Sequence, residues 1–151
     1  MLVLALVIGI VAGLRAMMAP AAIAWAASKG IVPLQGTWLA FLGWRFTPWI
    51  FTVLAAAELV TDQLPSTPSR KVPPQFGARI LTGGVSGAAV GYALGAPLFG
   101  LLLGVIGAVL GTLGGARLRA RLAQAFGNDR PAAVIEDVLA IGLSVLVVIL
   151  L

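Results

Sequence analysis

Long hydrophobic stretches separated by short polar ones make up most of this chain of 151 residues. A helix that crosses a bilayer needs about 20 predominantly apolar residues, and five segments have or approach that length. They lie near residues 2–28, 47–64, 77–96, 98–122 and 131–151. The pattern therefore predicts an all-α integral membrane protein with about five transmembrane helices, in a single polytopic domain that covers residues 1–151.

Composition strengthens this prediction and restricts the chemistry. Hydrophobic residues make up 60% of the chain and charged residues 10%, whereas soluble domains carry about 25% charged residues. The chain has no cysteine and no histidine, which excludes disulfides, thiolate or imidazole metal ligands, cysteine nucleophiles and histidine bases. We therefore expect no cofactor, and catalysis is less favoured than transport.

The first hydrophobic stretch contains features that a simple membrane helix lacks. The letters AIA at residues 22–24 are similar to a signal-peptide cleavage site, but no basic residues precede the apolar run and Arg15 interrupts it. The stretch is better explained as the first membrane helix. Pro20 removes one helical hydrogen bond, so we expect this helix to be kinked or broken near that residue.

Basic residues are unequally divided between the two sides of a five-span topology. Lys29 and Arg45 lie on one side. The other side holds Arg70, Lys71, Arg79, Arg117, Arg119, Arg121 and Arg130. By the positive-inside rule the more basic side is cytoplasmic, which predicts a bacterial inner-membrane protein with its N-terminus inside and its C-terminus outside. This rule also explains the net charge of +5, so we expect no nucleic-acid partner.

Three tryptophans surround Arg45 in the sequence GTWLAFLGWRFTPW, residues 36–49. Trp and Tyr are enriched where the membrane meets water. Residues 37–46 are therefore expected to form a short interfacial piece, and a re-entrant piece is the alternative.

Glycines recur every fourth residue in GGVSGAAVGYALG, at Gly83, Gly87, Gly91 and Gly95. This spacing leaves one helix face without side chains, and such faces let membrane helices pack backbone against backbone. A glycine zipper within the chain explains the pattern. Contact between copies in a homo-oligomer is the functional alternative.

Two similar heptads lie far apart in the chain, VIGIVAG at residues 7–13 and VIGAVLG at 105–111. Each is followed by arginine and small residues, and later by a helix that carries acidic residues. In a five-span topology the two heptads run in opposite directions. The pattern therefore indicates an inverted-topology repeat, an arrangement common in transporters and channels.

Charged residues inside the predicted spans mark the candidate site. Arg15 lies about 20 Å along its helix, near the middle of the bilayer, where a guanidinium needs a partner. Glu58 is the first candidate partner and Glu136 the second. A buried structural ion pair would explain these charges, but intramembrane charges more often serve function. We therefore expect a substrate site formed by Arg15, Pro20, Glu58, Asp62 and Glu136.

Several motifs together resemble one family of bacterial membrane proteins. They are GLRAM, GTWLAFLG, AELVTDQLPSTPSR, GARI and PAAVIEDVLAIG, and they are spread over most of the chain. The chain resembles the family known only as domain of unknown function 4126. The most specific element is the acid-to-proline stretch, residues 57–70. The resemblance implies a membrane fold and no particular activity.

Three functional interpretations follow from these features. The first is a small transporter or channel, embedded in the lipid bilayer as a homo-oligomer, that carries a small molecule or ion of anionic character. The second is a membrane enzyme acting on a lipid phosphate, with Mg²⁺ held by Glu58, Asp62, Glu136 and Asp137. The third is a structural or assembly subunit, for which glycine faces and buried ion pairs would suffice.

Overall fold

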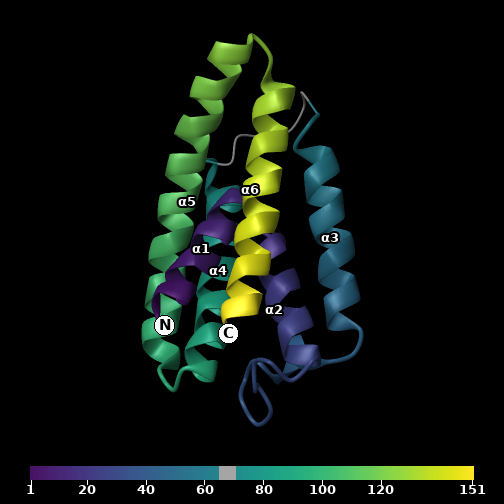
Figure 1. Cartoon of the computed structure of the whole chain (residues 1–151), viewed down its shortest axis with the longest axis vertical. Coiled ribbons are helices and arrows are strands. Elements are labelled where there is room, and N and C mark those ends of the chain that lie inside the picture. The colour runs from purple at the N-terminus through teal and green to yellow at the C-terminus, as the bar shows by residue number, and fades with distance from the viewer. Residues whose placement is uncertain (65–70) are drawn as a thin grey trace.

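The computed structural model describes residues 1–64 and 71–151, and over these ranges it contains helices and no strands (Figure 1). In chain order the helices are α1 (Val3–Leu14), α2 (Met18–Ser28), the 3-10 helix η1 (Ala40–Gly43), α3 (Thr47–Thr61), α4 (Pro73–Ala93), α5 (Pro97–Phe126) and α6 (Asp129–Leu150). The all-α class is confirmed. Arg70, expected in a basic loop, lies outside the described residues.

The first hydrophobic stretch forms a hairpin of two short helices. α1 rises from the N-terminus, and α2 returns toward the same end (Figure 1). The chain reverses at Arg15, whose backbone is extended, with φ −140° and ψ 108°. A kink or break was expected near Pro20, but the break lies at Arg15. Pro20 is the third residue of α2, where the absent N–H would have no partner within the helix.

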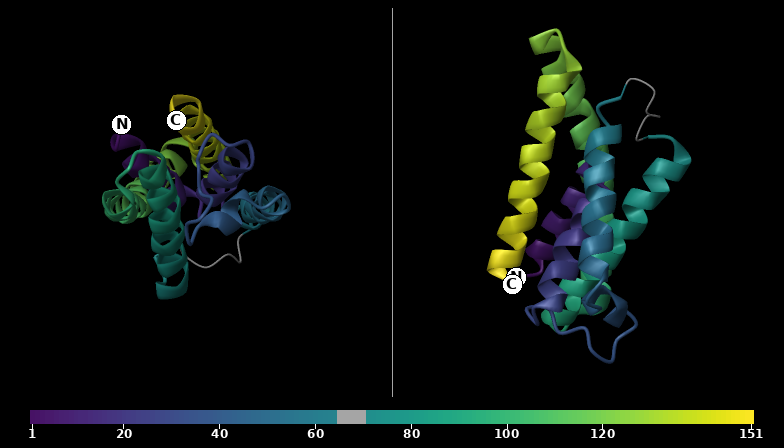
Figure 2. Two further views of the ribbon diagram at one scale, coloured as in Figure 1. Left: turned by 90° about the horizontal axis from the view of Figure 1, so that it is seen from below. Right: turned by 90° about the vertical axis from the view of Figure 1, so that its right-hand side faces the viewer.

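This reversal changes the topology expected from the sequence. α3 and α5 run in the same direction as α1, whereas α4 and α6 run in the direction of α2 (Figures 1 and 2). Both chain termini therefore lie at one end of the bundle, which we call the terminal end. The expectation that the two termini lie on opposite sides is wrong, because α2 returns instead of continuing α1.

Two helices are clearly long and apolar enough to cross a membrane, namely α5 with 30 residues and α6 with 22 residues. α1, α2 and α3 are apolar but shorter, with 12, 11 and 15 residues. Five transmembrane helices are therefore not confirmed within the described residues. Most of the side chains in the apolar stretches of α5 and α6 are not buried inside the chain.

The regularly spaced glycines pack α1, α4 and α5 against one another. A Cβ added to Gly87 of α4 would lie 2.7 Å from Cα of Gly104 in α5, and one added to Gly83 would lie 2.9 Å from the Gly104 carbonyl oxygen. Gly107 and Gly111 of α5 face the backbone of α1 in the same way. Packing within the chain is thus confirmed for these faces, and they give no support to a homo-oligomer.

The two similar heptads pack against each other. Gly9 of α1 faces Gly104 of α5, and farther along both helices Gly13 faces Gly111 and Thr112. Residue numbers therefore increase in the same direction on both helices, which makes them parallel. The inverted relation expected of the two heptads is wrong. Their likeness has a simpler physical cause, because each supplies the small residues that the other helix needs for close contact.

The tryptophan-rich piece covers the terminal end of the bundle. Trp38, Trp44 and Trp49 are each more than half exposed, and Arg45 stacks on Phe46 with its guanidinium carbon 5.0 Å from the ring centroid. The piece contains η1, which packs on α2 and α3. It lies at the end of the bundle and does not enter it (Figure 1), so the re-entrant alternative is wrong for residues 37–46.

Candidate functional site: a charge cluster at the hairpin tip

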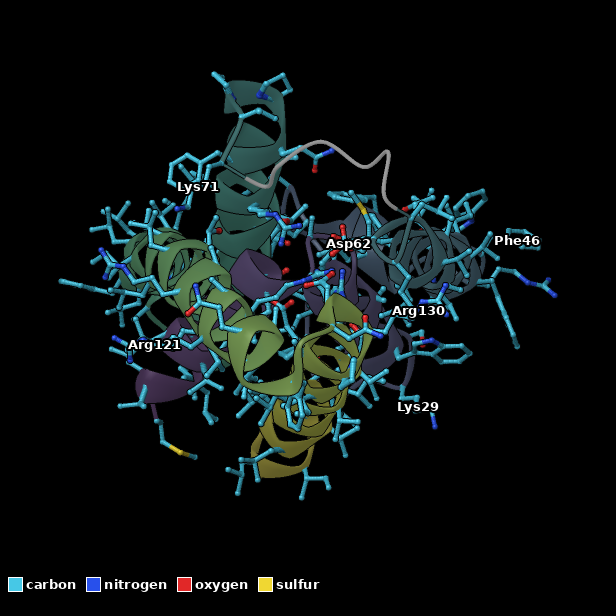
Figure 3. All side chains as sticks on the ribbon, turned by 90° about the horizontal axis from the view of Figure 1, so that it is seen from above. Lys29, Phe46, Asp62, Lys71, Arg121 and Arg130 are labelled. Atoms are coloured by element: carbon cyan, nitrogen blue, oxygen red, sulfur yellow. The ribbon has the colours of Figure 1, made fainter. Side chains whose placement is uncertain are left out.

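All five acidic residues of the chain lie around the tip of the α1–α2 hairpin, together with three arginines. We call this group the charge cluster. Its members are Arg15, Glu58, Asp62, Arg79, Arg119, Asp129, Glu136 and Asp137. Seen from above, oxygen and nitrogen atoms gather between the helices beside Asp62 (Figure 3).

Arg15 connects α3 to α6 through two carboxylates. Its side chain is fully buried and pairs with Asp62 and Asp137, and its Nε donates to Oδ1 of Asp137 at 2.6 Å. The expected pairing with Glu58 or Glu136 is wrong. Because the chain reverses at Arg15, this side chain leaves the tip of the hairpin and reaches Asp62, one helical turn beyond Glu58.

Glu58 instead accepts hydrogen bonds from the backbone at the start of α2. Its two carboxylate oxygens accept hydrogen bonds from the backbone N–H groups of Ala16 and Met17, each at 2.8 Å. These groups stand at the N-terminal end of α2, where N–H groups lack helical partners and the helix dipole favours negative charge. Nη2 of Arg79 lies 3.4 Å from Oε1 of Glu58.

Arg79 binds the C-terminal end of α1 at the hairpin tip. This arginine of α4 is buried, and its Nη1 donates to the carbonyl oxygens of Gly13 and Leu14 at 2.8 and 2.7 Å. The Thr112 hydroxyl of α5 lies 3.2 Å from the Gly13 carbonyl oxygen. Carbonyl groups at a helix C-terminus favour a cation, as N–H groups at an N-terminus favour an anion. The tip is therefore held by charges that match both helix dipoles.

Arg119 links the remaining acids to α3. It forms a two-pronged pair with Asp129, with donor–acceptor distances of 2.9 and 2.5 Å. The same guanidinium donates to the backbone oxygen of Asp62 at 3.1 Å and lies 3.6 Å from a carboxylate oxygen of Glu136. Four helices and the hairpin turn thus contribute to one connected network.

A cavity reaches the charge cluster from between α3 and α4. It has a volume of about 370 Å³ and is bordered by Glu58, Thr61 and Gln75 along with small and apolar residues. Ala16 and Met17 of the hairpin tip also line it. In the right-hand view of Figure 2 the beginning of α4 leans away from α3. The N–H groups bound by Glu58 therefore stand beside a space large enough for a small molecule.

The predicted site residues are only partly brought together. Arg15, Glu58, Asp62 and Glu136 belong to the cluster, but Pro20 is buried in the first turn of α2 and contributes no polar group. Asp137 was named from the sequence only as a possible magnesium ligand and was left out of the expected substrate site. Arg79 was also missed, because it was counted only among the basic residues on one side of the membrane although it lies six residues inside α4.

Arginines pair with the carboxylates that the magnesium hypothesis would use. Within residues 1–64 and 71–151 no group of three or more acidic residues is placed to hold a metal ion. Comparisons with protein families, characterised proteins and solved structures found no match to this chain. The resemblance seen in the sequence therefore stays a prediction.

Proposed function

We propose that the chain is a multi-pass protein of the bacterial inner membrane. Large apolar side chains are exposed along the outer faces of several helices, where water would solvate them poorly. Examples with exposed fractions above one half are Val53, Leu81, Leu98, Val138 and Ile149. Lipid is the solvent that suits this surface, and α5 and α6 have the length to cross it.

The basic residues favour an orientation opposite to the one expected for the N-terminus. Lys29 and Arg45 stand at the terminal end, whereas Lys71, Arg121 and Arg130 stand at the other end (Figures 1 and 3). The positive-inside rule then makes that second end cytoplasmic and both termini external. Single cysteines introduced at positions 2 and 151 should react with an impermeant maleimide on intact cells. Reaction at position 71, with protection of both termini, would contradict this orientation.

We propose further that the protein transports a small anionic solute, and the hairpin tip carries this argument. Charged side chains at membrane depth are costly and usually line a solute pathway. Interrupted helices whose ends meet inside the membrane are the way many transporters build a binding site. Here α1 and α2 meet at a turn surrounded by eight charged side chains.

The start of α2 is the place where the solute would bind. A helix N-terminus beside an arginine is suited to carboxylate or phosphate groups. Glu58 occupies this position and acts as an internal ligand. We infer that a small anion enters the cavity between α3 and α4, displaces Glu58 from the N–H groups of Ala16 and Met17, and contacts Arg79. Release of Glu58 would free this part of α3 to move.

Electrical recording on proteoliposomes tests this proposal. Purified protein would be reconstituted and exposed to gradients of chloride, acetate, phosphate and succinate on a solid-supported membrane. We expect a saturable current with at least one of these anions. Glu58→Gln removes the charge that competes for the site, so the half-saturating concentration should fall several-fold. Arg117→Gln changes an exposed arginine outside the charge cluster and should leave the current unchanged.

The outcomes test the charge of the solute, transport against a structural role, and the position of the site. Currents driven only by cation gradients would contradict the anionic solute. Currents no larger than those of protein-free liposomes, for protein that is folded by circular dichroism, would contradict transport and favour a structural role. A half-saturating concentration that is equal in Glu58→Gln and the parent would place the site elsewhere.

A further inference from the structure

A second hollow, separate from the cavity beside Glu58, runs along the other side of α3. It has a volume of about 430 Å³ and lies between α2, α3 and α6. We call it the apolar groove. Met18 and Trp25 of α2 form its floor, Ala56 and Leu59 belong to its α3 wall, and Val145 belongs to its α6 wall.

The groove offers no unsatisfied hydroxyl group to a ligand. Ser144 donates to the Ala140 carbonyl oxygen of its own helix at 2.7 Å. Thr52 donates to the Pro48 carbonyl oxygen at 2.7 Å and accepts from Nε1 of Trp25 at 3.0 Å. The remaining lining side chains are apolar. A hydrocarbon chain fits such a wall better than water or a polar solute, which would lose hydrogen bonds there.

The two ends of the groove differ in chemistry. The upper end stops at Leu59 and Ile141, about one helical turn below Asp62 and Asp137, which both pair with Arg15. The lower end reaches Trp25, and the exposed Lys29 follows one turn later. Seen from above, Lys29 lies in the angle between α6 and α3 (Figure 3).

The length of the groove matches one leaflet of a bilayer. Its α6 wall extends from Ile141 to Ile149, which is about 12 Å at 1.5 Å per residue. Half of a hydrocarbon core is about 15 Å. The groove therefore extends from the tryptophans at the terminal end nearly to the ion pairs at mid-depth.

We propose that the apolar groove binds one acyl chain of an anionic phospholipid from the leaflet at the terminal end. The phosphate lies near Lys29, and the chain lies along Met18 and Ala56 and ends below Arg15. The volume is near the lower end of the 300 to 1,000 Å³ typical of ligand pockets, which favours one chain over two. The site rests on the proposed membrane embedding but requires no transport activity.

Native mass spectrometry of the whole protein, released from detergent micelles, tests the site. The probes are phosphatidylglycerol and phosphatidylcholine with identical chains. We expect one lipid to be retained per protein, with phosphatidylglycerol bound several-fold more tightly. Ala56→Leu adds three carbons to the groove wall and should lower the retained fraction at least tenfold. Ala57→Leu is its matched control, because this neighbour on α3 faces the other cavity.

A second pair of variants tests the position of the head group. Lys29→Gln should remove the preference for phosphatidylglycerol, whereas Arg45→Gln, which changes another exposed cation at the same end, should preserve it. Circular dichroism and melting temperature check that Ala56→Leu is folded. If it unfolds, Ala22→Leu on the floor of the groove serves instead.

Equal lipid retention in Ala56→Leu, Ala57→Leu and the parent would overturn the proposal. A lipid-free dimer whose dissociation follows Ala56→Leu would also overturn it, since a second copy would then fill the groove. Loss of lipid binding with intact anion currents would leave the transport proposal standing. Lipid binding without currents would support the lipid site and contradict the transport proposal.

Discussion

Helices α1 and α3 are held in different ways. α1 packs against α4 and α5 through glycines, and its Ile8, Val11 and Ala12 have no exposed surface. Beyond α2, helix α3 buries only Thr47, Pro48 and Ala55 of its 15 residues and borders a cavity on each side. Backbone contact therefore fixes one half of the molecule, while a few polar groups near Glu58 and Asp62 position α3.

This difference assigns separate tasks to the two halves. Closely packed backbones move little, because interiors at native density cannot deform without overlap. Regions with few buried apolar contacts open at low free energy. A solute that changes the partners of Glu58 would therefore shift α3, while α1, α4 and α5 stay in place. Four changes of decreasing expected effect test this comparison.

Breaking the glycine-packed half should have the largest effect. In Gly87→Leu the new side chain would overlap the backbone at Gly100 and Gly104, and neither can withdraw without separating α4 from α5. We expect destabilisation of at least about 3 kcal/mol, seen as loss of monodisperse protein on size exclusion and of the cooperative melting transition.

Gly114→Leu is the matched control for this change. Gly114 lies on the same helix as Gly104, but a Cβ there meets no atom within 4 Å. The free energy of unfolding of this variant should lie within about 1 kcal/mol of that of the parent, since one solvent- or lipid-facing substitution rarely changes it more. Equal damage from both variants would show that the close glycine contacts are not the source of the stability.

Removing Arg15 should rank second. Arg15→Met leaves the carboxylates of Asp62 and Asp137 without their shared cation in a buried setting, which typically costs about 3 to 5 kcal/mol. Adding Asp137→Asn should recover part of that loss, giving a coupling energy of about 0.5 to 3 kcal/mol in a double-mutant cycle. Unfolding in mixed micelles with increasing dodecyl sulfate, followed by circular dichroism, measures it.

Glu58 supplies the negative control for that cycle. Arg15 makes no direct pair with Glu58 among the described contacts, so Arg15→Met and Glu58→Gln should be closer to additive than Arg15→Met and Asp137→Asn. A larger coupling with Glu58 than with Asp137 would contradict the observed pairing.

The sequence predicted the helical class and four of the later segments within a few residues, because long apolar runs depend on local composition. It could not predict the reversal at Arg15, since Pro20 was the stronger local signal and a turn five residues earlier has no special composition. The heptads at residues 7–13 and 105–111 were recognised, but sequence similarity cannot distinguish a repeat from two surfaces that pack together.

The charge cluster was predictable as a set of residues but not as a set of pairs. The free-energy cost of placing a charge inside the membrane identified Arg15, Glu58, Asp62 and Glu136 from their places in apolar segments alone. Pairing depends on which helix ends meet. Because the reversal at Arg15 was not predicted, Glu58 was expected to pair with Arg15 in place of Asp62. Arg79 could have been found, because it lies inside the predicted span 77–96 with apolar and small neighbours in GARIL, so the same cost of a buried charge applied to it.

Neutralising Glu58 alone should have a moderate and local effect. Glu58→Gln keeps one carbonyl oxygen as an acceptor but loses the charge that favours the start of α2 and the contact with Arg79. Loss of a helix cap typically costs about 1 kcal/mol. Hydrogen exchange of the amides at residues 16–19 should accelerate, whereas those of α5 should not change. Acceleration throughout α5 would show that the two halves are not separable.

The smallest expected effect comes from removing the hydrogen bond between α2 and α3 near the terminal end. Thr52→Val keeps the shape of the side chain and removes the acceptor for Nε1 of Trp25, which lies 3.0 Å away. The edge-to-face contact of Trp25 with Trp49, whose ring centroids are 5.1 Å apart, remains. One hydrogen bond contributes about 0.5 to 1.5 kcal/mol, so global unfolding should barely shift.

Local measurements should nevertheless detect the Thr52 change, because α3 has so little buried surface to replace a lost contact. We expect faster hydrogen exchange along α3 and a shift in the emission of Trp25 in a variant that retains only this tryptophan. Thr82→Val is the control, since the Thr82 hydroxyl bonds only to carbonyl groups of its own helix, at 3.0 and 3.3 Å. If the two variants exchange alike, α3 is held by packing that its exposed surface does not reveal, and the contrast between α1 and α3 fails.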